Sequence, residues 1–201
     1  MATRAHVEID RARIKELTER ESAKLDARTQ GSREFYARAQ KSLVGGVASS
    51  YQSRDPWPIY LSHGKGAQVW DVDGNEYLDF HNGFGSMVQG HAHEAITKAV
   101  NARIELGTHF AAPTEDAIVV GEELARRWGL PKWRYVNSGS EATMDAIRIA
   151  RGTTGRDTIV KIFGSYHGHH DYVMVSIGVE YDRIGDRFDL ESLPYGLGIP
   201  Q

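Results

Sequence analysis

The sequence contains no cysteine. Disulfide bridges and cysteine-ligated zinc sites are therefore excluded, and the composition is typical of a cytosolic protein. A long apolar run is missing as well. Residues 1–20 are strongly charged, so we predict neither a secretory signal nor a membrane anchor. On these grounds we expect a cytoplasmic location.

Clusters of basic residues are also missing. The 24 Lys and Arg are outnumbered by 27 Asp and Glu, which gives a formal net charge of -3. Because nucleic acids and anionic membranes are bound by grouped Lys and Arg, this balance argues against either partner. The 201 residues, 40% of them hydrophobic, suit one globular domain or a fragment of a larger enzyme.

Patterning in the first part of the chain predicts helices and one hairpin. A polar helix is expected over residues 3–28, as an arm lying over another surface or at a subunit interface. The turn Asp73-Gly74-Asn75 joins β-prone runs at 67–72 and 76–80. Residues 48–58 are expected to be a loop. Further helices are predicted over residues 35–43, 94–105 and 114–128, the last with Thr114 as its N-cap.

The stretch from Trp133 to Phe163 predicts a strand, a helix and a second strand. The strands are expected at 133–136 and 158–163, and the helix at 141–151 is ended by the Gly152–Gly155 stretch. This βαβ order implies a parallel sheet, so the predicted fold class is α/β. Residues from Ile177 onward are loop-like, and we expect the sheet to be incomplete, with an open edge.

The turn from Asn137 to Ala142 lies between the first predicted strand and the helix. The start of a helix offers unpaired N–H groups and a partial positive charge. Gly139 lets the backbone approach an anion closely, and Ser138 and Ser140 add hydroxyl donors. The turn therefore predicts a phosphate cradle. The alternative is that Ser140 only caps the helix.

A second polar loop, from Gly164 to Asp171, follows the second predicted strand. Because ligands of open parallel sheets bind beyond the carboxyl ends of the strands, we expect this loop and the serine turn at one edge. Tyr166 offers a flat face to an aromatic ring. A planar heterocycle with a phosphate tail would use both loops.

The same loop has a rival interpretation as a metal site. His167, His169 and Asp171 match the spacing His-x-His-x-Asp of binuclear metal hydrolases. A second acid-and-histidine cluster is missing, because only His91 and His93 form another close pair. We therefore predict no metal. A further interpretation is that His169 and His170 are satisfied by backbone hydrogen bonds.

In this order the motifs resemble those of the class III aminotransferases, and among them the glutamate-1-semialdehyde aminomutase branch. The resemblance extends from about Gly45 to Gln201. It rests on residues 71–79 (DVDGNEYLD), 90–93 (GHAH), 112–115 (APTE), 137–152 (NSGSEATMDAIRIARG), 154–157 (TGRD) and 166–169 (YHGH).

The resemblance implies a fold-type-I architecture that depends on pyridoxal 5′-phosphate (PLP). It divides the chain into a helical arm at 1–31, a small-domain segment at 32–90 and the first half of the PLP-binding large domain at 91–201. It also implies a homodimer with active sites shared between subunits. The family's Schiff-base lysine lies later in the large domain, so we expect it beyond Gln201 and expect this chain alone to be inactive.

The resemblance also assigns individual positions. Ser138–Ser140 would bind the cofactor phosphate. Tyr166 would stack on the pyridine ring, with His167 beside it. Phe84 falls where the family places an aromatic wall of the substrate pocket.

One position departs from the aminomutase pattern. After Gly45-Gly46-Val47 that branch continues toward an arginine that grips the substrate carboxylate, but here the position is Gln52, with Arg54 two residues on. Glutamine cannot form the bidentate charged pair that arginine gives a carboxylate. We therefore predict amino transfer between an amino acid or amine and an oxo acid. The aminomutase reaction and a non-catalytic binding or assembly role are the alternatives.

Overall fold

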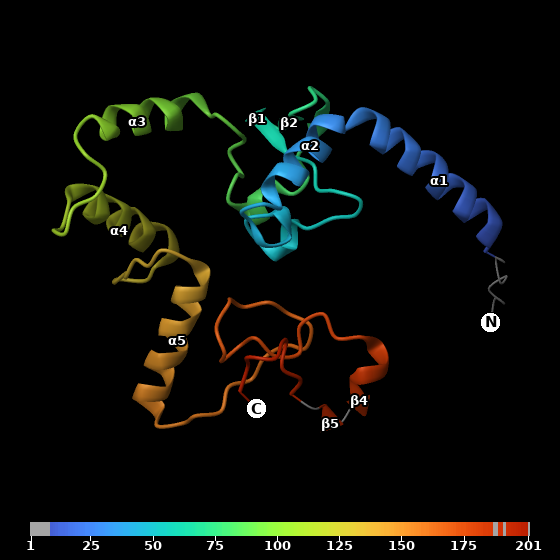
Figure 1. The fold of residues 1–201 in the computed structure, drawn as a ribbon. Coiled ribbons are helices and arrows are strands. Elements are labelled where there is room, and N and C mark those ends of the chain that lie inside the picture. Colours follow the sequence, from blue (N-terminus) through green and yellow to red (C-terminus); the bar gives the residue numbers. More distant parts are fainter. Residues whose placement is uncertain (1–8, 187–188, 191, 201) are drawn as a thin grey trace, which may run out of the picture. The chain divides into compact units, whose positions relative to one another are not determined.

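The computed structural model describes residues 9–186, 189–190 and 192–200 (Figure 1). The described chain forms two compact units, one up to Phe110 and one from Ala111 onward. The predicted boundaries after residues 31 and 90 stay a prediction. Among the described helices, none combines the length and the apolar composition needed to cross a membrane.

The first unit is built on a small antiparallel sheet in the order β1-β2-β3. The strands are β1, Leu61–Lys65; β2, Gln68–Asp71; and β3, Glu76–Leu78. The hairpin of β2 and β3 confirms the prediction, and Val69 faces Tyr77 in its register. Strand β1 was not predicted, because LSHGK has no alternation of apolar residues.

A buried carboxylate organises the turn of this hairpin. Asp71 is only 2% exposed. Its Oδ1 accepts hydrogen bonds from the backbone N–H groups of Asp73 (3.0 Å) and Asn75 (2.8 Å). Its Oδ2 accepts from the Asn75 amide (2.9 Å) and the Tyr77 hydroxyl (2.7 Å). Four donors therefore converge on one side chain and hold the turn in shape.

The tip of the hairpin also fixes the start of a distant helix. Helix α1 covers Arg11–Arg28 and α2 covers Gln30–Ala39. The Asp73 carboxylate accepts from the backbone N–H groups of Gly31 (2.6 Å) and Ser32 (3.0 Å), at the first turn of α2. It thus acts as an N-cap supplied from about 40 residues away.

The junction between α1 and α2 is buried against the same unit. Thr29 and Ser32 have no exposed surface. The Trp57 indole donates to the Thr29 hydroxyl (3.0 Å), and the backbone N–H of Tyr60 donates to the Ser32 hydroxyl (3.1 Å). The prediction of a helix at 35–43 was wrong at both ends. The start of α2 was missed because its cap is Asp73, which is distant in the sequence and leaves no signal near residue 30.

Replacing Asp73 by alanine should lower the free energy of unfolding by about 1–2 kcal/mol, since the first turn of α2 loses its cap. Urea unfolding followed by tryptophan fluorescence measures this. Glu34→Ala is the matched control, because it removes the same charge from an exposed position on α2. Equal effects of the two variants would refute the capping role.

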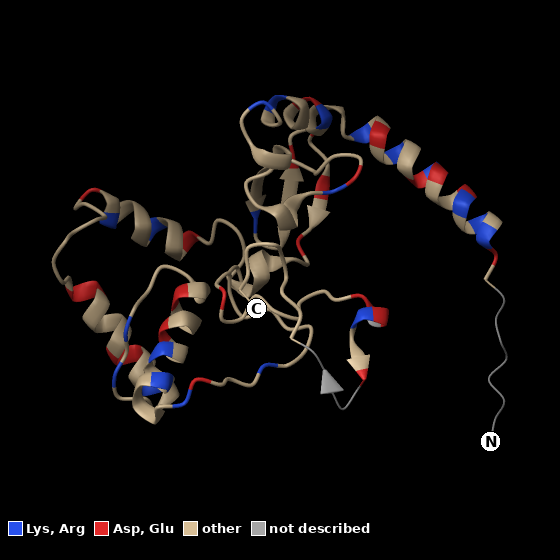
Figure 2. Cartoon of the chain, turned by 60° about the horizontal axis from the view of Figure 1, so that its bottom comes forward, with Lys and Arg blue, Asp and Glu red and all other residues tan. Residues whose placement is uncertain are grey.

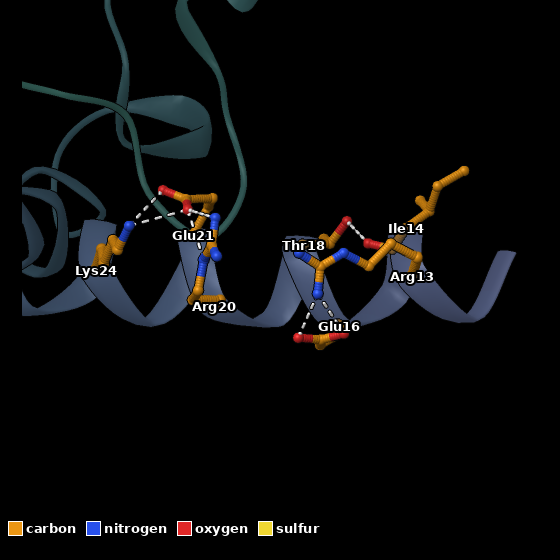
Figure 3. A network of polar contacts seen from close by, with 7 residues as sticks. All are labelled: Arg13, Ile14, Glu16, Thr18, Arg20, Glu21 and Lys24. Atoms are coloured by element: carbon orange, nitrogen blue, oxygen red, sulfur yellow. Dashed lines mark hydrogen bonds and ion pairs between the residues drawn. The ribbon is translucent and has the colours of Figure 1, made fainter. Parts of the chain in front are cut away.

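Helix α1 is stabilised mainly along its own surface. Asp10 caps it by accepting from the backbone N–H of Arg13 (2.9 Å), and none of its residues is buried. Figure 2 shows acidic and basic residues spread along it. Figure 3 shows the pairing of Arg13 with Glu16 and of Lys24 with Glu21, each three residues apart. The predicted range 3–28 is confirmed from Arg11, and residues 3–8 lie outside the described residues.

The helices on either side of the division between the units match their predictions. Helix α3 covers Glu94–Ile104 and α4 covers Glu115–Trp128. Thr114 occupies the N-cap position of α4, but its side chain makes no capping hydrogen bond. The remaining helical turns are short 3-10 segments: η1, Val44–Gly46; η2, Ser50–Gln52; η3, Asn82–Gly85; and η4, Tyr181–Arg183.

The second unit contains the predicted long helix without the predicted strands. Helix α5 covers Gly139–Thr154 and ends at Gly155, which adopts a left-handed conformation (φ +67°). Residues 133–136 and 158–163 form no strand, so the predicted parallel pair is wrong for the described residues. A strand exists only through hydrogen bonds to a neighbour, and here Val160 is fully exposed. The strands of this unit are β4, Gly185–Asp186, and β5, Asp189–Leu190.

Candidate functional site

The N-terminus of α5 presents free donors beside two hydroxyl groups. The Ser138 hydroxyl accepts from the backbone N–H of Glu141 (3.2 Å), so Ser138 is the capping residue. The alternative that Ser140 caps the helix was therefore wrong. Within the described part of the chain, the backbone N–H groups of Gly139 and Ser140 have no hydrogen-bond partner. These two donors carry the positive end of the helix dipole.

The hydroxyl of Ser140 joins this turn to the second polar loop. It accepts a hydrogen bond from the backbone N–H of His169 (2.8 Å). A hydroxyl has one proton to donate, and this contact leaves that proton for another acceptor. The loops expected at one edge of a sheet thus meet, although the strands that led to that expectation are not formed.

Close backbone packing accompanies this contact. Gly168 is buried, has φ +121°, and lies so near α5 that a Cβ would stand 2.9 Å from Ser140 Cα. The Thr143 hydroxyl reaches the carbonyl oxygen of His167 (2.7 Å). Residues 167–169 are therefore held directly against the first turn of α5.

The side chains of the loop lie around this contact. Tyr166 is 59% exposed, so its ring has a face available for stacking. His167 pairs through Nε2 with the Ser165 hydroxyl (2.9 Å), and His170 Nε2 lies 3.1 Å from the Thr143 hydroxyl. The α5 N-terminus offers free donors, and the loop bound to it carries an exposed aromatic face; this combination fits a phosphorylated aromatic ring.

The imidazole groups of this loop do not converge. Across the described residues, no three His, Cys, Asp or Glu side chains are grouped as they would be to hold a metal ion. His167 and His170 are instead directed at hydroxyl groups. The structure therefore offers no support for the metal-hydrolase interpretation of the His-x-His-x-Asp spacing.

In the first unit, Phe84 lies in a left-handed turn. Asn82, Gly83, Phe84 and Gly85 have φ values of +50°, +52°, +56° and +90°. Such a conformation costs an L-residue about 1–2 kcal/mol, so a run of this kind points to a constrained and functional segment. The Phe84 side chain is 75% exposed.

Two further aromatic rings accompany Phe84, and sequence reasoning missed both. The Phe84 ring meets His81 and Tyr51 edge to face, with centroids 4.2 Å and 5.3 Å away. Tyr51 and His81 are themselves stacked, with their centroids 6.4 Å apart. The loop at 48–58, which carries the 3-10 turn η2, thus supplies part of an aromatic surface. Aromatic residues at 51 and 81 were the only signal for it.

The residues at the expected carboxylate-binding position are occupied locally. The Gln52 side chain accepts from the backbone N–H of Ser49 (3.1 Å) in a capping box. Arg54 donates through Nη1 to the carbonyl oxygens of Tyr51 (2.7 Å) and Ser53 (2.6 Å). Neither side chain is therefore held out as a carboxylate clamp.

An acid and a histidine lie beside this turn. Asp79 accepts from the backbone N–H groups of His81 (2.9 Å) and Asn82 (2.8 Å), and it pairs with His91 Nε2 (2.7 Å). The hydrogen bonds from Asn82 and His91 lower the pKa of Asp79. A cavity of about 520 Å³ adjoins it; the lining residues are Gly66, Ala67, Asp79, Phe80, Asn82, Met87, Val88, Gln89 and Gly90.

The comparisons with known proteins place these features in one family. The family model described as "Aminotransferase class-III" matches residues 49–189, a range that includes Phe84, the α5 turn and the loop of Tyr166. The chain belongs to the class III aminotransferases. Its fold is accordingly the α/β fold of the fold-type-I, PLP-dependent enzymes, of which these residues form a part.

Individual relatives agree with this placement. The chain is 47% identical over 148 residues to a glutamate-1-semialdehyde 2,1-aminomutase of Methanocaldococcus jannaschii, which covers 73% of this chain and 35% of that protein. An ω-transaminase of Sphaerobacter thermophilus has a TM-score of 0.79 at 38% identity, over 84% of this chain and 39% of that one. A transaminase with PLP bound has a TM-score of 0.74 at 36% identity, over 86% and 39%. The chain thus spans about a third of the curated relative's length.

Proposed function

We propose that the chain contributes the phosphate-binding and ring-stacking part of a PLP-dependent enzyme that transfers an amino group between an amino acid or amine and an oxo acid. The observation that carries this proposal is the joining of the α5 N-terminus to the Tyr166 loop through Ser140 and His169. It is supported by membership of the class III family.

In this proposal each residue has a binding role. The free N–H groups of Gly139 and Ser140 and the Ser140 hydroxyl donate to the phosphate oxygens. Tyr166 covers one face of the pyridine ring, with His167 at its side. Phe84 forms a wall of the substrate pocket. The cofactor, when bound, supplies the electron sink for amino transfer.

We prefer amino transfer over the aminomutase reaction because of Gln52. The side chain at this position is a neutral amide already bound to Ser49, and Arg54 is tied to its own loop. The aminomutase remains the second candidate, since the curated relatives carry that name. In a complete class III enzyme carrying these residues, amines or amino acids with an oxo-acid acceptor should react, and glutamate-1-semialdehyde should not. Faster turnover of the semialdehyde would reverse this preference.

The proposal extends to assembly and location. A homodimer with shared active sites is the arrangement that the family resemblance implies. A cytoplasmic location is supported by the absence of cysteine. Sedimentation of the complete enzyme checks the first point, and fractionation of cells checks the second.

Replacing Ser140 by alanine should weaken the binding of PLP about tenfold, because one hydrogen bond to a charged group is worth about 1.5 kcal/mol. Fluorescence titration of the chain with pyridoxine 5′-phosphate measures the effect without imine formation. Thr153→Ala is the control, since Thr153 is exposed near the opposite end of α5. Unchanged affinity in Ser140→Ala would remove the main support for the proposal.

A further inference from the structure

We propose that Thr143 is a positioning residue for the cofactor: its hydroxyl holds the loop that carries Tyr166 at the distance from the α5 N-terminus that a phosphorylated pyridine requires. The proposal rests on the proposed function of Ser138–Ser140 and Tyr166. It assigns a role to Thr143 that the family motifs quoted above did not assign.

The contacts of Thr143 reach both parts of the site. Its Oγ1 lies 2.7 Å from the carbonyl oxygen of His167, a residue 24 positions away, and 3.1 Å from His170 Nε2. Within α5 the same atom lies 3.0 Å from the carbonyl oxygen of Gly139 and 3.1 Å from that of Ser140. Thr143 is thus, with Ser140, a side chain at which the helix turn and the loop meet.

The single proton of the Thr143 hydroxyl limits the hydrogen bonds that it can donate. Oγ1 has one proton, and the nearest acceptor is the His167 carbonyl oxygen. With that proton donated, His170 Nε2 can bond only by donating to Oγ1. In the neutral form of His170 the proton then sits on Nε2, and Nδ1 carries a lone pair. That atom is buried and has no partner among the described residues.

The consequence falls on Tyr166. Its ring is 59% exposed, and no hydrogen bond holds its hydroxyl among the described residues. The next residues along the chain are fixed: His167 by Thr143 and His169 by Ser140. Thr143 therefore sets the placement of the ring, whereas the N–H donors of the phosphate turn belong to α5 itself.

These separate roles predict that a Thr143 variant loses affinity for the ring compound and largely keeps its affinity for phosphate. Thr143→Val replaces the hydroxyl by a methyl group of similar size. It should weaken pyridoxine 5′-phosphate about tenfold, roughly the effect of one hydrogen bond, and change the affinity for inorganic phosphate less than about twofold. Thr143→Ser keeps the hydroxyl and should restore binding of the ring compound. Where the valine disturbs folding, Thr143→Ala removes the same hydroxyl and is measured instead.

The experiment is a titration of the full chain and these variants with both probes, with circular dichroism to confirm folding. Selective loss in Thr143→Val with recovery in Thr143→Ser supports the proposal. Equal loss of both probes means a purely structural role and overturns it, as does unchanged binding of both. If the unmodified chain binds neither probe, the proposed function fails as well, and this outcome is distinct from a failure confined to the variant.

Discussion

Replacing Asp71 by alanine should lower the free energy of unfolding by about 3 kcal/mol, because buried donors lose their shared acceptor. The N–H groups of Asp73 and Asn75, the Asn75 amide and the Tyr77 hydroxyl all point at this carboxylate. The Asp73 cap of α2 depends on the same turn. Urea unfolding followed by tryptophan fluorescence measures the loss.

The effect should depend on pH with a defined sign. Burial raises the pKa of Asp71, but hydrogen bonds from Asn75 and Tyr77 outweigh it and leave the pKa below its ordinary value. A carboxylate of this kind contributes stability that is fully present above its unfolded pKa, about 3.9, and lost as pH falls through the lower folded pKa. The difference between the protein and Asp71→Ala should therefore narrow below about pH 4.

Tyr77 gives the alkaline counterpart. Burial and the hydrogen bond to Asp71 raise the pKa of Tyr77 to about 12. Its neutral form thus contributes stability below about pH 10 that is lost as pH rises through the folded pKa. Tyr77→Phe should remove that dependence.

Glu105→Ala is the control for Asp71→Ala, because it removes an exposed acid from the same unit. An equal loss of unfolding free energy in Glu105→Ala would contradict the role of Asp71.

Gly168→Ala should weaken the binding of pyridoxine 5′-phosphate by at least roughly tenfold, which corresponds to about 1.4 kcal/mol. Two effects add. The backbone has φ +121°, where a side chain is strained, and the new Cβ would stand 2.9 Å from Ser140 Cα. Because the opposing atom is backbone, the loop must move away from α5, and the contact between Ser140 and His169 is lost.

Gly164→Ala is the matched control for Gly168→Ala, because it introduces backbone strain without displacing the loop from α5. Gly164 is in the same loop with φ +80°, but a Cβ there would have no atom within 4 Å. This variant should lose about 1 kcal/mol of stability and keep its affinity for the ring compound. Equal affinities for Gly164→Ala and Gly168→Ala, measured by the same titration, would show that the close approach at Gly168 does not shape the site.

Local signals predicted the elements that depend on local chemistry. Asp73-Gly74-Asn75 marked the hairpin because a glycine with positive φ suits its turn, and Gly74 has φ +83°. Helix α5 was predicted over residues 141–151 and is observed over Gly139–Thr154, so it begins within the predicted serine turn and ends at Gly155, the last residue of the predicted glycine stretch. The apolar spacing of α3 and the acidic first turn of α4 likewise gave correct ranges.

Features that depend on distant residues were missed. The start of α2 is set by Asp73, and β1 owes its existence to pairing with β2. The segments at 133–136 and 158–163 have the composition of strands, yet composition does not supply a hydrogen-bonding neighbour. In the candidate site, the serines and Tyr166 were visible as a motif, whereas Thr143 acts through a carbonyl group that no motif reveals.

The left-handed turn at Asn82–Gly85 restricts how the proposed pocket wall can change over evolution. Glycine and asparagine tolerate such φ values, and an unbranched residue such as Phe84 tolerates them at a moderate energetic cost. Valine, isoleucine and threonine do not, because branching at Cβ brings a second atom against the backbone. Substitution at this position is therefore restricted to aromatic, straight-chain or small side chains, and β-branched ones are disfavoured.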